Sequence, residues 1–327
     1  MKLVGMRIGV RWQNEQIMEQ KVKAMSVTDS ILRYPGGKTQ LTGFIQHLME
    51  INHMNHPVYC EPFCGGAGVA FKLLLSGKVD KIILNDLDNA IYSIWYAVLY
   101  DTNRFLAKVQ SAVLALDEWK RQKDIYNRLK NLNEYDIDLA FAAFYLNRTN
   151  RSGIISGGPI GGMQQNGRYK LGCRFNKETL ERKIRRIAAR TGHIHLCHMD
   201  GIDFIENKLP NYVNRNLFIF FDPPYVKQGP VLYNTSLTLK YHEQLADDIQ
   251  RIKEAKWITT YDNDSRISQS YDGSKQFKYL IRYSAAVKGQ QYELMLAKPG
   301  LTIESSDRVI LESSECDILH PTEDFKK

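Results

Sequence analysis

Residues 58–77, VYCEPFCGGAGVAFKLLLSG, decide the fold class of this chain. A short apolar run, VYCEPF, ends in the glycine-rich turn GGAG, and an apolar helical pattern, VAFKLLLSG, follows the turn. The run KIILND at residues 81–86 then predicts a second buried strand. This order of strand, turn, helix and strand is typical of the first unit of a parallel α/β sheet.

Further apolar runs extend the predicted sheet. HIHLCHM at 193–199 and LFIFFD at 217–222 predict two strands, and the helical pattern YHEQLADDIQRIKEA leads to a third, WITTYD, at 257–262. Two β-rich runs, YLIRYSA and YELMLA, complete the pattern as a predicted antiparallel hairpin. We therefore expect an α/β fold whose sheet is mostly parallel, with this hairpin at its C-terminal end.

The middle of the chain interrupts the α/β pattern with helices and a basic, glycine-rich stretch. Residues 89–147 carry helical patterns, whereas Gly, Ser and Asn abound from Thr149 to Asn176 and disfavour long helices or strands. From Arg148 to Arg190 there are eleven Lys or Arg residues against two acids. Such a concentration indicates a surface that faces nucleic acid. The solvated face of an amphipathic helix, KETLERKIRRIAAR, accounts for part of it.

The whole-chain composition indicates a basic, globular protein. The chain has 327 residues, 43% of them hydrophobic, and a formal net charge of +8, which favours a polyanionic partner. Its five cysteines form no CxxC pair. Residues 1–28 lack a secretory h-region, and no apolar stretch approaches the length of a membrane span. We therefore expect a cytoplasmic protein that does not associate with membranes.

The segment YPGGKTQL at residues 34–41 is similar to the end of a phosphate-binding loop. The Walker A pattern GxxxxGK[ST] requires a glycine where Leu32 stands, so the spacing excludes that assignment. A surface turn is the plainer alternative, because Pro-Gly-Gly strongly favours turns. The role of Lys38 therefore depends on the rest of the chain.

Asp86 ends the second predicted strand, about 20 residues beyond Gly65 of the glycine turn. The backbone of such a turn approaches a ligand closely, and an acid at this position typically accepts hydrogen bonds from ribose hydroxyls. Capping of the helix that begins near LDNAIYSIW is the alternative role, and the two roles are compatible.

The run IFFDPPY at residues 219–225 carries the most specific chemical signal. An apolar strand places Asp222 at its carboxyl end, where open α/β sheets bind their ligands. Pro223 and Pro224 stiffen the turn and remove two backbone donors, and Tyr225 adds an aromatic face. These acceptors beside an aromatic ring suit a planar ring with an exocyclic amine. A simple Pro-Pro turn after a strand is the alternative.

In this order, the segments YPGGK, EPFCGG, NDLD and DPPY resemble the Dam-type family of DNA adenine methyltransferases over about residues 30–300. The resemblance implies a Rossmann-like sheet with a helical target-recognition insertion. It also implies S-adenosylmethionine as cofactor and methyl transfer to the N6 amine of a flipped-out adenine in double-stranded DNA. Residues 29–100 and 193–300 would form the catalytic domain and 101–192 the insertion. An unassigned leader (1–28) would precede them and an acidic tail (301–327) would follow.

The resemblance implies three sets of site residues. The set that would line the cofactor pocket is Tyr34, Lys38, Glu61, Phe63, Gly65, Asp86, Asp203 and Phe204. The catalytic set that would grip the target adenine is Asp222, Pro223, Pro224 and Tyr225. The insertion segments YLNRTNRSG and NGRYKLGCRFNK are similar to DNA-contacting segments of the family. The DNA-binding set within them is Arg148, Arg151, Arg168, Lys170 and Arg174.

Some of these residues have a more definite implied role. Asp86 would hold the ribose of the cofactor. Asp203 would read the adenine amine of the cofactor, with Phe204 beside the ring. Lys38 would satisfy a carboxylate or a backbone acceptor in the pocket.

Two departures from the family pattern stand out. Ala67 replaces a glycine in the turn FCGGAG, a small residue that still permits close approach of a ligand. Arg151-Ser152-Gly153 stands where Dam enzymes carry an aromatic-Asn-Gly sequence, which argues against recognition of GATC and offers Arg151 for phosphate or guanine contact.

No metal site is expected. His193, His195 and Cys197 would share one face of a strand, but a single strand rarely closes a tetrahedral site, and a sulfonium methyl is already activated. The Asp-Pro-Pro-Tyr sequence alone leaves open a methyltransferase acting on RNA or on the N4 amine of cytosine. A catalytically silent DNA-binding or regulatory member is the alternative from another class. A restriction endonuclease partner is likewise left open.

Overall fold

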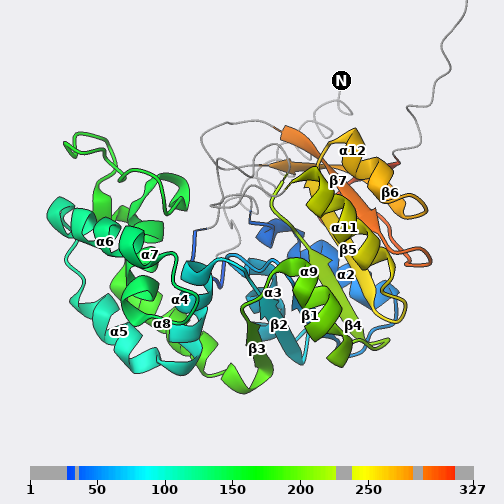
Figure 1. Cartoon of the computed structure of the whole chain (residues 1–327), viewed down its shortest axis with the longest axis horizontal. Coiled ribbons are helices and arrows are strands. Elements are labelled where there is room, and N and C mark those ends of the chain that lie inside the picture. Colours follow the sequence, from blue (N-terminus) through cyan, green and yellow to red (C-terminus); the bar gives the residue numbers. More distant parts are fainter. Residues whose placement is uncertain (1–27, 34–36, 226–237, 283–289, 314–327) are drawn as a thin grey trace, which may run out of the picture.

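The computed structural model describes residues 28–33, 37–225, 238–282 and 290–313 (Figure 1). Within these ranges, eight strands form one sheet in the order β3-β2-β1-β4-β5-β7-β6-β8. The parallel strands are β1 (Val58–Glu61), β2 (Lys81–Asn85), β3 (Ile194–Cys197), β4 (Leu217–Phe221) and β5 (Lys256–Asp262). The antiparallel strands are β6 (Lys275–Arg282), β7 (Gln290–Ala297) and β8 (Leu311–Ser313). The expected α/β fold with a C-terminal antiparallel hairpin is confirmed.

Apolar layers pack on both faces of the sheet. Successive residues of β4 alternate between them, with Phe218 and Phe220 in one buried cluster and Ile219 and Phe221 in the other. A strand covered on both faces has no solvated side, which is why LFIFF is apolar throughout. The first cluster includes residues of α2 (Thr42–Ile51), α3 (Gly68–Leu75) and α4 (Asn89–Tyr100). The second includes residues of α9 (Gly201–Asp203), α11 (Leu239–Gln250) and α12 (Ser265–Ser270).

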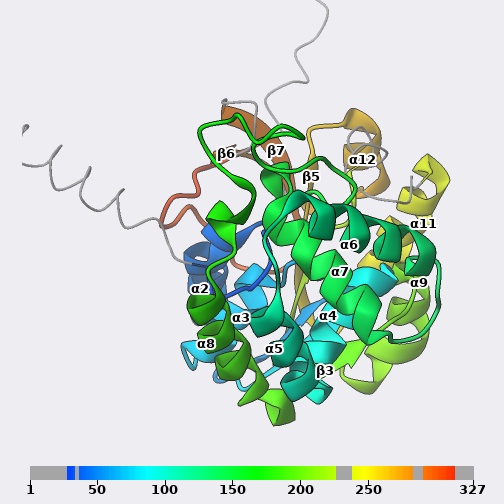
Figure 2. The same ribbon diagram turned by 90° about the vertical axis from the view of Figure 1, so that its left-hand side faces the viewer.

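A helical lobe stands beside the sheet and faces the viewer in Figure 2. It consists of α5 (Thr102–Ser111), α6 (Leu116–Leu129), α7 (Ile137–Thr149) and α8 (Lys177–Ala188), which pack on one another and on α4. α7 is buried on nearly every side, as its sequence IDLAFAAFYLNR predicts. No helix in the described part of the chain has the length and apolar character needed to cross a membrane.

Short helical turns complete the chain path through the described residues. They are η1 (Thr39–Leu41), η2 (Arg151–Gly153), η3 (Leu171–Arg174), η4 (Thr191–His193), η5 (Phe204–Lys208) and η6 (Leu209–Asn211).

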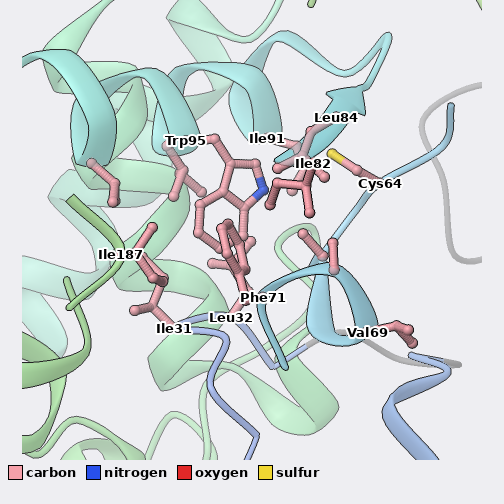
Figure 3. Packing of buried hydrophobic residues seen from close by; sticks show 14 of the residues in the cluster. Ile31, Leu32, Cys64, Val69, Phe71, Ile82, Leu84, Ile91, Trp95 and Ile187 are labelled. Atoms are coloured by element: carbon pink, nitrogen blue, oxygen red, sulfur yellow. The ribbon is translucent and has the colours of Figure 1, made fainter. Parts of the chain in front are cut away.

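A buried cluster around Trp95 joins the sheet to the helical lobe (Figure 3). The indole ring of Trp95, on α4, packs on Phe71 of α3 with 4.7 Å between ring centroids. Its Nε1 donates to the carbonyl oxygen of Gly65 at 2.8 Å. Leu32, and Ile187 on α8, belong to the same cluster. One set of contacts therefore fixes the glycine turn, the segment before residue 34 and a helix of the insertion.

Residues 301–313, the described part of the acidic tail, pack on the sheet. Leu301 and Val309 are each 3% exposed within the core, and β8 pairs with β6. The backbone N–H of Thr302 donates to Oδ1 of Asn52 on the end of α2 at 3.0 Å. Single apolar residues among the acids, Leu301 and Val309, therefore pack this segment against the core.

Leu301→Ala should therefore destabilise the protein. Removal of a buried leucine side chain leaves a cavity, and we expect a loss of about 2–5 kcal/mol in the free energy of unfolding, measured by urea denaturation. Ile310→Ala is the matched control, because that side chain is 66% exposed and its loss should cost less than about 0.5 kcal/mol. Equal effects of the two substitutions would contradict docking of this segment.

Candidate active site

The parallel strands deliver the expected site segments to one edge of the sheet. β1 ends at Glu61, directly before the glycine turn, and β2 ends at Asn85, directly before Asp86. β4 ends at Phe221, directly before Asp222. Because these strands are parallel neighbours, their carboxyl ends lie on the same edge, where open α/β sheets bind ligands.

Asp86 holds the glycine turn by a side-chain contact. Its Oδ2 accepts a hydrogen bond from the backbone N–H of Gly65 at 2.7 Å, and its Oδ1 accepts from the backbone N–H of Asp88 at 2.9 Å. Asp88, not Asp86, caps α4, since its Oδ1 accepts from the N–H of Ala90 at 2.8 Å. Burial, with repulsion from Asp88 added, raises the pKa of Asp86 to about 7.

Glu61 is tied to the start of α3. The side chain is 5% exposed, and its Oε1 accepts from the hydroxyl of Tyr59 and from the backbone N–H of Ala70, both at 3.0 Å. Ala70 lies in the first turn of α3, where backbone donors are unused by the helix. Burial raises the pKa of Glu61 to about 8.

The segment before and within YPGGKTQL packs on the glycine turn. Ser30 Oγ donates to the carbonyl oxygen of Gly66 at 2.5 Å. A Cβ atom at Gly68 would lie 2.2 Å from Oγ1 of Thr39, so a larger residue here would require the Thr39 side chain to move. Tyr34 lies outside the described residues.

Lys38 is buried, and its ammonium group lies among acceptors from distant parts of the chain. The residue is 5% exposed. Its Nζ donates to the hydroxyl of Tyr225 at 2.5 Å and lies 3.4 Å from Oδ1 of Asp222 and 3.4 Å from Oε2 of Glu293. The lysine of this segment therefore pairs with carboxylates of the protein itself.

Asp222 is oriented at the end of β4. Its Oδ1 accepts from Oγ1 of Thr260, on β5, at 2.8 Å, in addition to its ion pair with Lys38. The Asp222 side chain is 24% exposed, so a ligand can reach the carboxylate. Burial raises its pKa, while Lys38 and the Thr260 hydroxyl oppose that shift. Pro223, which is buried, and Pro224 follow directly.

Glu293 and Tyr279 complete the cluster, and the sequence did not single them out. Glu293, on β7, is 2% exposed, and the hydroxyl of Tyr279, on β6, donates to its Oε2. Burial raises the pKa of Glu293, against the lowering effect of Lys38. An acid inside the apolar strand YELMLA was the available signal, because a buried carboxylate requires a partner.

Asp203 lies on α9, beyond the end of β3, and not directly at the strand end. Asp203 is exposed on α9, and Phe204 is fully buried in the core. Asp200 stands closer to the end of β3. Its Oδ1 caps α9 at the N–H of Ile202 (2.8 Å), and its Oδ2 accepts from the hydroxyl of Tyr241 (3.0 Å). An Asp-Gly pair soon after the strand was the sequence signal for this position.

Of the two aromatic residues of the expected cofactor set that the structure describes, Phe63 is partly exposed and Phe204 is buried. A Cβ atom at Gly201, beside Asp200, would lie 2.4 Å from the Phe63 ring. Phe63, Gly201 and Asp200 therefore lie together beside the ends of β1 and β3.

The basic residues of the insertion divide into two kinds. Arg148 is turned toward the protein, where its Nε donates to the carbonyl oxygen of Arg174 at 2.8 Å and its Nη1 to that of Ile31 at 3.3 Å. Burial and the neighbouring guanidinium groups of Arg33 and Arg174 lower the pKa of Arg148 to about 10. The other members of the expected DNA-binding set are exposed, and they are Arg151, Arg168, Lys170 and Arg174.

Tyr169 lies between two of these exposed cations and was missed from the sequence. It is 55% exposed, and the guanidinium carbons of Arg168 and Arg174 lie 5.6 and 5.9 Å from its ring centroid. An exposed aromatic ring flanked by guanidinium groups is typical of surfaces that contact nucleic-acid bases. The tripeptide Arg168-Tyr169-Lys170 was the signal.

Side-chain amides hold the glycine-rich loop of the insertion in place. Nδ2 of Asn150 donates to the carbonyl oxygens of Ile154 and Ile155, both at 2.9 Å. Nε2 of Gln165 donates to the carbonyl oxygen of Ile160 at 2.7 Å. These bonds replace the regular secondary structure that the glycines disfavour.

The HIHLCH segment is arranged differently from a metal site on one strand. β3 begins at Ile194, so His193 lies in η4, where its Nδ1 is 2.9 Å from the carbonyl oxygen of Asp80. The described residues contain no group of three or more His, Cys, Asp or Glu side chains that could hold a metal ion.

A mostly parallel sheet with a glycine turn after its first strand and Asp-Pro-Pro-Tyr at another strand end is the Rossmann-like arrangement expected of a methyltransferase. A family model described as D12 class N6 adenine-specific DNA methyltransferase matches residues 34–293, and the chain belongs to this family. The protein is therefore an adenine-specific DNA methyltransferase. The family confirms that expectation over the RNA and cytosine alternatives.

Individual proteins similar to this chain include one curated relative and several solved structures. Type II methyltransferase M.MjaIII of Methanocaldococcus jannaschii is 28% identical over 259 residues, covering 74% of this chain and 84% of that protein. The rRNA methyltransferase aviRa of Streptomyces viridochromogenes shares 11% identity at a TM-score of 0.38, covering 81% of this chain and 86% of that one. TrmN of Thermus thermophilus shares 9% identity at a TM-score of 0.35, and the match covers 77% of this chain and 47% of that one.

The raised pKa of Glu61 predicts a specific pH dependence of stability. A glutamate ionises near pH 4.5 in the unfolded chain but near pH 8 in the folded protein, so the folded state binds more protons between these values. Its stabilising contribution is complete below about pH 4.5 and is lost as pH rises through about 8. Urea denaturation should show that wild type loses more stability from pH 5 to 8.5 than Glu61→Gln. Parallel curves would rule out the raised pKa.

Proposed function

We propose that the carboxyl edge of β1, β2 and β3 binds S-adenosylmethionine and that the adjoining end of β4 binds the target adenine. The bound cofactor supplies a methyl group already activated by its sulfonium. The single observation that carries this proposal is the arrangement at Asp222, whose carboxylate is oriented by Thr260 and Lys38 beside two prolines and an aromatic residue.

The residues of this edge fit the cofactor in their chemistry. Asp86 offers carboxylate acceptors to ribose hydroxyls and already fixes the turn at Gly65. Phe63 offers an aromatic face for the purine, and Asp200 an acceptor for its amine. We place Asp200 in the role expected of Asp203, because Asp203 is exposed on α9 and Asp200 lies nearer the strand end.

The target adenine would be bound through its amine. A carboxylate oxygen of Asp222 and the carbonyl oxygen of Pro223 would accept the two amine hydrogens, which raises lone-pair density on N6. Tyr225 would stack on the base and return about 1–3 kcal/mol of the few kcal/mol that flipping costs. The remaining requirement is alignment of two reactants in a site of fixed charges.

The insertion at 101–192 would bind the duplex through its exposed cations. Arg151, Arg168, Lys170 and Arg174 would contact phosphates or base edges, with Tyr169 among them. Arg148 has a structural role in this proposal, since its guanidinium group is committed to backbone carbonyls.

The proposal is tested by transfer of tritiated methyl groups to unmethylated duplex DNA, followed by nucleoside analysis. We expect N6-methyladenine at a defined sequence, revealed by methylation mapping in a methylase-free host. Absence of incorporation on diverse sequences would exclude the proposed donor or substrate.

Asp222→Ala should abolish methyl transfer without loss of cofactor binding. Loss of the amine acceptor removes a group that acts on the reacting nitrogen, and we expect a fall in single-turnover rate of at least about 10²-fold. Calorimetric titration should give a dissociation constant for S-adenosylmethionine within about threefold of wild type. Asp247→Ala, at an exposed position of α11, is the control and should keep full activity.

Replacing Arg168 and Arg174 together by alanine should weaken DNA binding. We expect about a 10-fold loss of affinity at moderate salt and a reduction of the salt slope by roughly 2, one for each lost phosphate contact. Arg215→Ala is a matched control, because Arg215 precedes β4 at the opposite edge of the sheet and its side chain is 90% exposed. An unchanged salt slope in the double variant would contradict the assignment.

A further inference from the structure

We propose that Glu293 is a positioning residue for methyl transfer: it shares the Lys38 ammonium with Asp222 and thereby keeps Asp222 a strong acceptor for the target amine. This inference rests on the proposed role of Asp222. It concerns a residue on β7, far from Asp222 in sequence, that no motif of the chain contains.

The geometry places Glu293 in direct competition with Asp222 for the same cation. Nζ of Lys38 lies 3.4 Å from Oε2 and 3.5 Å from Oε1 of Glu293, and 3.4 Å from Oδ1 of Asp222. An ammonium shared between two carboxylates at equal distances binds neither as tightly as it would bind one alone. Glu293 therefore sets how strongly Lys38 neutralises Asp222.

Asp222 must remain a strong acceptor for its role. The contacts described above from Lys38 and Thr260 both fall on Oδ1 of Asp222. A cation held by Asp222 alone would withdraw charge from the carboxylate and weaken its hydrogen bond to the amine. With Glu293 present, Lys38 orients Asp222 while the carboxylate keeps its acceptor strength.

The position of Glu293 is rigid. Glu293 lies opposite Asp262 in the antiparallel pairing of β5 and β7, and Thr260 of the same β5 holds Asp222. Tyr279, opposite Glu293 on β6, donates its hydroxyl to Oε2. Side chains locked on neighbouring strands maintain the spacing of charges that a precise site requires.

Lys38 also links this cluster to Tyr225. Its Nζ donates to the Tyr225 hydroxyl at 2.5 Å and lies 4.9 Å from the ring centroid. The cation that Glu293 positions therefore contacts both the acceptor carboxylate and the aromatic residue proposed to stack on the base.

The acid side of the pH–rate profile distinguishes this role from simple structural support. Asp222 must be ionised before its carboxylate can accept the amine hydrogens, so the acid limb of the rate follows the pKa of Asp222. Burial raises this pKa and Lys38 lowers it. Other charged or titratable groups also face the cluster from the elements packed around it. They are Tyr59 and Glu61 on β1, Asp262 on β5, Tyr279 on β6 and Tyr225 after β4.

Removal of the charge on Glu293 leaves these groups in place. Of the two carboxylates that Lys38 pairs with, Asp222 then remains as its anionic partner. That change should lower the pKa of Asp222. The acid limb of the single-turnover rate should then move to lower pH in Glu293→Gln. A merely structural role would not move it in this direction.

The experiment compares the full-length chain with Glu293→Gln in single-turnover methylation of duplex DNA. We expect the rate at neutral pH to fall roughly 10–100-fold, as for partners that orient a reacting group. The acid limb of the pH–rate profile should move to lower pH. The dissociation constants for DNA and S-adenosylmethionine should stay within about threefold of wild type. Glu312→Gln is the matched control, because Glu312 occupies an exposed position of β8, and it should behave as wild type.

Tyr279→Phe provides a second variant should Glu293→Gln fail to fold. It keeps both carboxylates and removes the hydroxyl that holds Oε2, so a smaller fall in rate with unchanged binding is expected. A wild-type rate and unmoved acid limb in folded Glu293→Gln would overturn the inference, as would a wild-type rate in Tyr279→Phe. An inactive wild-type protein would instead refute the proposed function.

Discussion

The site depends on one buried cation. Lys38 is 5% exposed, and a charged ammonium removed from water to this extent is stable only with close anionic partners. Asp222 and Glu293 supply them from β4 and β7, two strands that are not neighbours in the sheet. The antiparallel strands added to the parallel sheet therefore contribute to the charged cluster around Lys38 as well as to the core. They bring a second carboxylate to a lysine that precedes the first strand in the chain.

The segment that carries Lys38 is fixed by both parts of the protein. Asn147, on α7 of the insertion, accepts from the backbone N–H of Arg33 and donates to its carbonyl oxygen, both at 2.9 Å. Ser30 binds the glycine turn at Gly66. The helical lobe and the glycine turn thus both hold residues 30–33. This arrangement explains how an insertion between two strands can be held in fixed relation to the strand ends.

The cations of the insertion occupy two environments that sequence counting could not separate. Arg148 and Lys183 donate to backbone carbonyls of the segment around residues 28–31 and of Arg174, and burial lowers the pKa of both. The guanidinium groups of Arg168 and Arg174 that flank Tyr169 are exposed to solvent. Burial, rather than residue type, distinguishes the two groups, and burial is a property of the tertiary structure.

The sequence by itself determined the fold class, the strand that ends at Asp222 and the glycine turn followed by Asp86, because these depend on local patterns of apolar, glycine and proline residues. Only the tertiary structure decided the partners of Lys38, the positions of Glu293 and Asp200, and the docking of residues 301–313. Those features join residues far apart in the chain. Their contacts arise from strand order and side-chain burial, which no local pattern encodes.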